Sequence, residues 1–135
     1  MTGARTEHAS AAVLRRLLEA FATGDAELEG AVLTEDVVWH APGTHRFSGR
    51  FEGREAVLRR LDAMQEAGIT ARFDVHDVVA NDEHAIALVH LHLEVGDGRR
   101  YDQPQVQVAH VRDGLIAEFW TMNQDQAVLD VLIGA

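Results

Sequence analysis

The segment from His84 to Val111 constrains the fold most, because it reads as two alternating strands joined by a tight turn. The stretches 86–93 and 103–109 both place side chains of one polarity at every second position, which indicates half-buried β-strands. Asp97 and Gly98 lie between them, and Asp-Gly is the preferred pair for a two-residue type I′ turn. This turn predicts that Gly96 pairs with Arg99, and it sets the register of the whole hairpin.

With this register, the predicted cross-strand pairs match in polarity, apart from Leu88 with Gln107. A slip of one residue would place apolar side chains opposite polar ones. The sequence therefore predicts a sheet with one apolar face and one face that carries two histidines and three glutamines. The predicted apolar pairs are Val89 with Val106, Ala87 with Val108 and Leu91 with Pro104, and the predicted pairs of the other face are His90 with Gln105, His92 with Gln103 and Leu88 with Gln107.

Composition excludes several classes of protein. A chain of 135 residues that is 47% hydrophobic is expected to fold as one globular domain, residues 1–135. The chain has no cysteine, which excludes disulfides and zinc-thiolate sites. Its net charge of −10, with no lysine, disfavours nucleic acid and anionic membranes as partners. No apolar run approaches the ~20 residues of a membrane span and no signal pattern opens the chain, so we expect a cytoplasmic protein.

The remaining segments predict an α+β domain, in which helices come first and antiparallel strands follow. Gly24 is expected to end the first helix, and Asp25 and Asp125 are expected to cap later ones. The predicted helices are 7–23, 25–33, 54–67 and one that starts at Asp125, and the predicted strands are 36–40, 69–80, 85–95, 99–111 and 115–123.

Several of these segments together resemble a known family. They are Thr23-Gly24-Asp25, the stretch 35–43 (EDVVWHAPG), the stretch 51–55 (FEGRE) that opens a helix, the stretch 112–118 (RDGLIAE) and Asp125. The chain resembles SnoaL-like proteins of the nuclear-transport-factor-2-like superfamily, which includes ketosteroid isomerases, polyketide cyclases and limonene-type epoxide hydrolases. The resemblance implies a cone: a curved sheet wrapped around the first and third helices, a cavity on the concave side, and a dimer formed through the convex side.

The catalytic groups of those enzymes do not carry over. Where the resemblance implies the aspartate base and the tyrosine of a ketosteroid isomerase, this chain has Ala41 and Leu17, and Gln107 replaces the second oxyanion donor. Thr121 stands near the acid/base aspartate of the cyclases. The Asp-Arg-Asp set of the epoxide hydrolases has no counterpart in this chain. Each inherited mechanism therefore lacks its carboxylate.

The polar face is the candidate site. A three-residue turn at 112–114 would set Gln107 beside Phe119, Gln105 beside Thr121 and Gln103 beside Asn123, and the resemblance implies that this face is concave. His90 and His92 are the predicted catalytic residues, because imidazole titrates near neutrality. The alternative is that this face is simply solvated. The predicted substrate-binding residues are Trp39, His45, Gln103, Gln105, Gln107, Phe119, Thr121 and Asn123.

The histidines allow three other arrangements. His90 and His92 could hold a metal as a pair, but the predicted register supplies no third ligand, so neither a metal nor an organic cofactor is expected. His40 has the opposite strand parity to Trp39 and should face outward. The role of His76 stays open.

Two functions follow as hypotheses. The first is a cofactor-free general acid–base enzyme, an isomerase, cyclase or dehydratase, that acts on a mostly apolar carbonyl compound. The second is a non-catalytic small-molecule-binding or structural dimeric module with the same fold. In either case we expect a homodimer, because the predicted apolar sheet face would otherwise be a large exposed patch. That face comprises Val89, Leu91, Val106, Val108 and Trp120.

Overall fold

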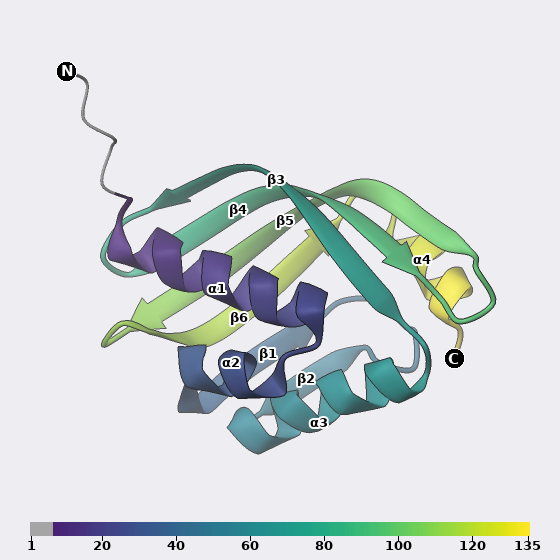
Figure 1. The fold of residues 1–135 in the computed structure, drawn as a ribbon, viewed down its shortest axis with the longest axis horizontal. Helices are drawn as coiled ribbons and strands as arrows, with labels where there is room; N and C mark the ends of the chain where they lie inside the picture. The colour runs from purple at the N-terminus through teal and green to yellow at the C-terminus, as the bar shows by residue number, and fades with distance from the viewer. Residues whose placement is uncertain (1–6) are drawn as a thin grey trace.

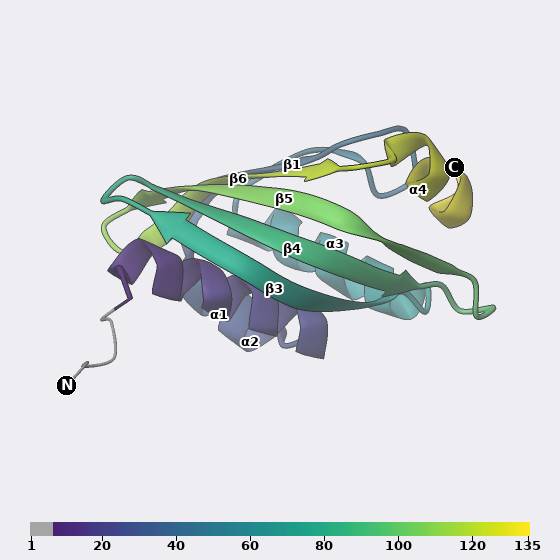
Figure 2. The ribbon, with the colours of Figure 1, turned by 90° about the horizontal axis from the view of Figure 1, so that it is seen from above.

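One curved six-stranded sheet forms a wall of the molecule, and three helices cover its concave side (Figures 1 and 2). The computed structural model describes residues 7–135, and within them no helix is long and apolar enough to cross a bilayer. The α+β cone expected from the sequence is confirmed. The elements are α1 (Ala9–Thr23), α2 (Ala26–Val32), β1 (Leu33–Ala41), β2 (Gly49–Glu52), α3 (Arg54–Glu66), β3 (Thr70–Ala80), β4 (His84–Glu94), β5 (Arg100–Arg112), β6 (Leu115–Asn123) and α4 (Gln126–Ile133).

The strand order is β2-β1-β6-β5-β4-β3. Neighbouring strands are antiparallel except β1 and β6, which run parallel, so the expectation of a purely antiparallel sheet is wrong at this one pair. No tight turn joins β1 to β6, and their relative direction is therefore free of hairpin geometry. The other expected strands and all four expected helices are present, with ends shifted by a few residues.

Helix ends form where the sequence indicated them. Gly24 ends α1 in the left-handed conformation, at φ 68°. The Asp25 side chain accepts a hydrogen bond from Leu28 N at 3.0 Å and begins α2, and Asp125 does the same for α4 through Val128 N at 3.2 Å. Each aspartate satisfies one of the free backbone N–H groups at a helix start.

The main core lies between α1 and the concave face of the sheet. Leu14 and Leu17 of α1 are fully buried and share this core with Val37, Ala87 and Ile116 of three strands. A second cluster includes Leu93 and Tyr101 of the β4–β5 end and Leu129 of α4. The helix α4 lies near the C-terminus, beside this end of the sheet (Figure 1). These two clusters pack the helices against the sheet.

The β4–β5 hairpin has a different register from the predicted one. Val95 and Arg99 close a three-residue turn, Gly96-Asp97-Gly98, in place of the two-residue turn at Asp97-Gly98. Gly98 lies at φ 88°, which a three-residue hairpin loop requires at its last position. The added turn residue shifts the pairing by one, so that His90 lies opposite Pro104 and His92 opposite Asp102.

This shift reverses the face that β4 presents. Val89 and Leu91 point into the core with exposed fractions of 5% and 3%, whereas His90 and His92 lie on the convex side. The predicted apolar dimer face is therefore wrong in its β4 members. Its β5 and β6 members, Val106, Val108 and Trp120, do lie on the convex side.

The β5–β6 hairpin keeps its predicted faces despite another change of register. Asp113 and Gly114 form a two-residue turn, with φ 53° and 79°, and a bulge follows between His110 and Val111. Gln107 consequently pairs with Thr121 instead of Phe119. The shift is two residues, so each side chain stays on the predicted side.

Candidate functional site

A cavity of about 70 Å³ lies between the concave sheet face and α1, α3 and α4. It is lined mostly by apolar side chains, with a few amides, one histidine and one arginine. This composition is typical of a small-molecule site, although the volume is well below the ~300–1,000 Å³ of drug-sized pockets. The lining residues are Leu17, Leu18, Phe21, Trp39, Ala41, Pro42, His45, Arg60, Met64, Phe73, Leu91, Leu93, Gln105, Gln107, Phe119, Thr121, Asn123, Leu129 and Ile133.

The sequence-predicted site residues divide into two groups. The structure brings seven of the predicted substrate contacts to the cavity wall: Trp39, His45, Gln105, Gln107, Phe119, Thr121 and Asn123. Gln103 shares their strand face but lies nearer the hairpin tip, outside the lining. The expectation that His90 and His92 face the cavity is wrong, because the one-residue shift of β4 turns both imidazoles to the convex side.

Aromatic rings form one wall of the cavity. The rings of Trp39 on β1 and Phe119 on β6 pack with centroids 4.2 Å apart, and Phe21 and Phe73 form an edge-to-face pair at 5.9 Å. Trp39 and Phe119 lie opposite one another in the parallel pairing of β1 and β6. These contacts give the wall an apolar, aromatic surface.

A chain of side-chain amides runs along another wall. Gln107 Nε2 donates to Gln105 Oε1, Gln105 Nε2 to Asn123 Oδ1, and Asn123 Nδ2 to Gln126 Oε1, each at 2.8 Å. Gln126 Nε2 then donates at 2.8 Å to the carboxylate of Asp130 on the same helix, α4. This row of hydrogen-bonded amides links β5, β6 and α4 through buried or half-buried polar groups.

The Asp130 carboxylate, at the α4 end of these hydrogen-bonded amides, determines the direction in which each amide donates. Burial favours the neutral form of Asp130, but hydrogen bonds from Gln126 and Thr44 outweigh it and hold the pKa of Asp130 below its usual value. An ionised carboxylate can only accept, so Gln126 must donate to it, and each amide before it must donate in turn. Gln107 is therefore left with its carbonyl oxygen free, and within the described residues 7–135 this buried Oε1 has no hydrogen-bond partner.

His45 lies in the loop between β1 and β2, with an exposed fraction of 7%. Its Nδ1 accepts a hydrogen bond from Phe47 N at 3.1 Å, so the proton of the neutral ring is on Nε2. Burial, together with the charge of Arg60, lowers the pKa of His45, and Asp130 opposes this only partly. His45 is therefore a neutral imidazole at pH ~7, with Nε2–H available as a donor.

Two charged residues with shifted pKa values were not predicted from the sequence: Arg60, which lines the cavity, and Glu29, which does not. Burial raises the pKa of Glu29 on α2 to about 7 and lowers the pKa of Arg60 on α3 to about 10, and each partly offsets the shift of the other. Arg60 Nε donates to Phe47 O at 2.9 Å, and its guanidinium lies 5.4 Å from the ring centre of Phe51. The sequence did contain one sign that Arg60 is enclosed: it lies on the buried side of α3, three residues after Val57.

The loop that carries His45 is tied to α4. Arg46 N donates to Gly134 O at 2.8 Å, and Thr44 Oγ1 donates to Asp130 Oδ2 at 3.2 Å. Gly43 makes this contact possible, because a Cβ there would lie 2.1 Å from Asp130 Oδ1 and its φ of 91° disfavours other residues. The same carboxylate thus positions both the amide chain and the His45 loop.

Comparisons with known structures agree on the fold. The chain is 26% identical to a protein of unknown function with a cystatin-like fold from Xanthomonas campestris, with a TM-score of 0.82 over 92% of this chain and 97% of that one. An NTF2-like protein from Burkholderia pseudomallei matches at 22% identity and a TM-score of 0.84, over 96% and 100% of the two chains. An LEH-like epoxide hydrolase from Mycobacterium tuberculosis matches at 20% identity and a TM-score of 0.75, over 90% of this chain and 85% of that one.

Sequence comparison identifies the family. No curated protein matches the chain. A sequence profile of the SnoaL-like domain matches residues 14–119, which span β1 to β5, most of α1 and the first half of β6. The chain therefore belongs to the SnoaL-like domain family, with the NTF2-like fold.

Proposed function

We propose that this protein binds a small, mostly apolar molecule that carries a hydroxyl or N–H donor. The observation that supports this most directly is Gln107 Oε1, a buried acceptor on the wall of a mostly apolar cavity, with no hydrogen-bond partner among residues 7–135. A buried polar group without a hydrogen bond costs about 1–3 kcal/mol. A ligand that donates to this oxygen removes that cost, whereas an apolar analogue leaves it in place.

The rest of the cavity suits the remainder of such a ligand. Trp39 and Phe119 offer an aromatic surface to an apolar body, and His45 offers Nε2–H to a carbonyl oxygen. The volume of about 70 Å³ is smaller than the ~150 Å³ of a cavity that holds benzene, so a single-ring ligand fits only if side chains of the wall move apart. With that movement, single-ring hydroxy-carbonyl compounds match the aromatic wall, the free acceptor and the His45 donor.

A panel of single-ring phenols tests the binding proposal, each compared with the analogue that has methyl in place of hydroxyl. Para-hydroxybenzaldehyde and para-tolualdehyde are one such pair. Isothermal titration should show that the hydroxyl compound binds about tenfold to a hundredfold more tightly, which corresponds to the ~1–3 kcal/mol of an unpaired acceptor. The variant Gln107→Leu should lose this preference, because its leucine needs no donor.

Gln103→Leu is the matched control, since Gln103 lies on the same strand face but outside the cavity lining. It should keep the preference of the wild type. Equal affinity of wild type and Gln107→Leu for the hydroxyl compounds would contradict the proposal, and so would an absence of binding across the panel.

A catalytic role is the second candidate, and His45 supports it. A neutral imidazole that donates Nε2–H can polarise a carbonyl and favour loss of an adjacent proton. Among residues 7–135, however, no carboxylate lines the cavity to act as base, and this favours the binding role. Deuterium exchange into the methyl group of para-hydroxyacetophenone, followed by NMR, distinguishes the two. Catalysed exchange that His45→Gln abolishes and the convex-face variant His40→Gln retains would establish the enzyme.

A further inference from the structure

The convex face carries a cluster of histidines and aspartates from three adjacent strands. Asp74 of β3 lies opposite His90 of β4, and His92 of β4 lies opposite Asp102 of β5. The observed register creates this arrangement. With a two-residue turn, His92 would face Gln103, and no carboxylate of β5 would lie beside it.

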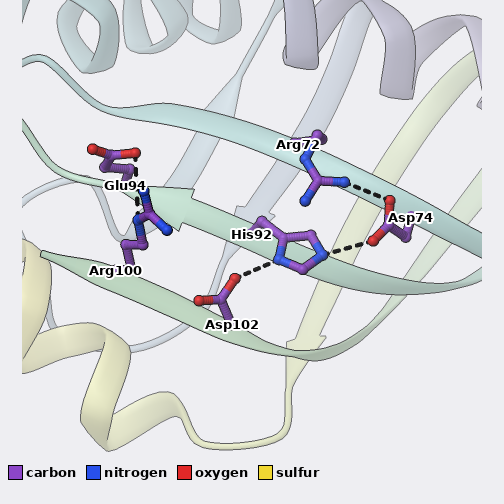
Figure 3. A network of polar contacts seen from close by, with 6 residues as sticks. All are labelled: Arg72, Asp74, His92, Glu94, Arg100 and Asp102. Carbon is purple, nitrogen blue, oxygen red and sulfur yellow. Dashed lines mark hydrogen bonds and ion pairs between the residues drawn. The ribbon is translucent and has the colours of Figure 1, made fainter. Parts of the chain in front are cut away.

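Side chains of this cluster are already oriented by one another (Figure 3). The ring of His92 lies between two carboxylates: Nε2–H donates to Asp74 Oδ2 at 2.7 Å, and Nδ1–H donates to Asp102 Oδ1. Arg72 donates to the other oxygen of Asp74, also at 2.7 Å, and Arg100 pairs with Glu94 at 3.7 Å. The two arginines are thus engaged elsewhere, and Asp102 keeps an oxygen for another partner.

His90 also belongs to the cluster, although it forms none of these ion pairs. Its ring lies 4.7 Å from that of His92, at an angle of 34°, which brings two imidazoles and the Asp102 carboxylate to one point of the surface. One nitrogen from each imidazole and one oxygen of Asp102 all lie within 4.8 Å of one another. Ligand atoms around a tetrahedral Zn²⁺ lie about 3.3 Å apart, so small side-chain rotations bring these three into coordinating positions.

We propose that this cluster binds one divalent transition-metal ion of the zinc type, through His90, His92 and Asp102. The metal takes the place of the proton between His92 Nδ1 and Asp102. Two imidazoles and one carboxylate are a ligand set that suits Zn²⁺ and its transition-metal neighbours, whereas Ca²⁺ and Mg²⁺ prefer oxygen ligands. Three protein ligands leave a coordination position open to water.

The groups around these ligands support the assignment. A metal-binding histidine usually donates its other ring N–H to a carboxylate, which fixes the orientation of the ring. Asp74 does this for His92 through Nε2, and Arg72 in turn holds Asp74. The site is also open to solvent, because the Asp102 side chain is 47% exposed, and the net charge of −10 favours a cation.

The test is isothermal titration of the untagged, chelator-treated chain with Zn²⁺. We expect one Zn²⁺ per chain with a dissociation constant in the micromolar range or below. His90→Gln, His92→Gln and Asp102→Asn should each abolish this binding. Asp74→Asn should keep the stoichiometry and weaken the affinity by about 10–100-fold, as is typical for loss of a partner of a metal ligand.

The double variant His84→Gln/His110→Gln is the matched control. These two histidines also stack across β4 and β5, with centroids 5.3 Å apart, but lie outside the cluster. The control should bind Zn²⁺ like the wild type, and circular dichroism should show that every variant is folded. The proposal is overturned by no saturable binding at millimolar Zn²⁺, by half an equivalent per chain, or by binding that survives His90→Gln.

Discussion

Replacement of Glu29 by glutamine should remove a large part of the pH dependence of stability. Glu29 is 1% exposed, and no group in the part of the chain that the structure describes forms a hydrogen bond with its Oε2. Burial, opposed only in part by the charge of Arg60, raises its pKa from 4.5 to about 7. The folded chain therefore keeps a proton on Glu29 over a range in which the unfolded chain has already released it.

Thermodynamic linkage gives the direction in which the stability changes with pH. A group whose pKa is higher in the folded state stabilises the fold at low pH, and this contribution is lost as the pH rises through the folded value. The pKa difference between about 7 and 4.5, at about 1.36 kcal/mol per pKa unit, corresponds to about 3 kcal/mol. That contribution is fully present below pH ~4.5 and absent well above pH ~7.

Urea denaturation followed by tryptophan fluorescence measures this effect at a series of pH values. Between about pH 4 and about pH 9, the unfolding free energy of Glu29→Gln should gain about 3 kcal/mol relative to wild type, because glutamine cannot ionise. Glu27→Gln is the matched control, since Glu27 lies exposed on the same helix and should follow the wild-type curve. Parallel pH curves for wild type and Glu29→Gln would refute the reasoning and would mean that Glu29 has the same pKa in the folded and the unfolded chain.

Two further predictions concern the convex face. Hydrogen bonds to Asp102 and Asp74 raise the pKa of His92, so its stabilising contribution is complete below the unfolded value of ~6.5 and is lost as the pH rises through the folded value. In the presence of a chelator, His92→Gln should therefore lower the urea midpoint more at acid than at alkaline pH, and an equal loss at both would count against it. The homodimer stays a prediction, now through the apolar convex surface of Leu88, Val106, Val108, Trp120 and Met122, of which Leu88 and Met122 are 40% and 53% exposed. Light scattering should show a wild-type dimer that Met122→Arg dissociates, and a wild-type monomer at micromolar concentration would dismiss the idea.

Local sequence determined most of the elements and their ends. Asp25, Asp125 and Gly24 act within one turn of their own position, so their effect does not depend on distant residues. The side-chain faces of β5 and β6 also followed from alternation. Their register moved by two residues, and a shift of two leaves every side chain on the same side.

Only tertiary packing decided which face β4 turns inward. The sequence Gly96-Asp97-Gly98 supports a two-residue and a three-residue turn, and local geometry separates them weakly. The three-residue turn lets Ala87, Val89 and Leu91 meet the concave side, where α1 and the cavity lie. Matching polarity across the strands pointed to the other register because it assumed that each face of the sheet is either apolar or polar throughout.

The inner face is not uniform, because it lines a cavity. Gln105 and Gln107 are buried there beside apolar side chains of β4, and the carboxylate of Asp130, far along the chain, orients them. Glu29 and Arg60 are likewise enclosed by packing that no local pattern encodes, although the place of Arg60 in an apolar stripe hinted at it. The alternation of polarity along a strand indicates which residues share a face of the sheet. Which face is enclosed, and which polar groups are left without a partner, depends on contacts between segments that meet only in the folded chain.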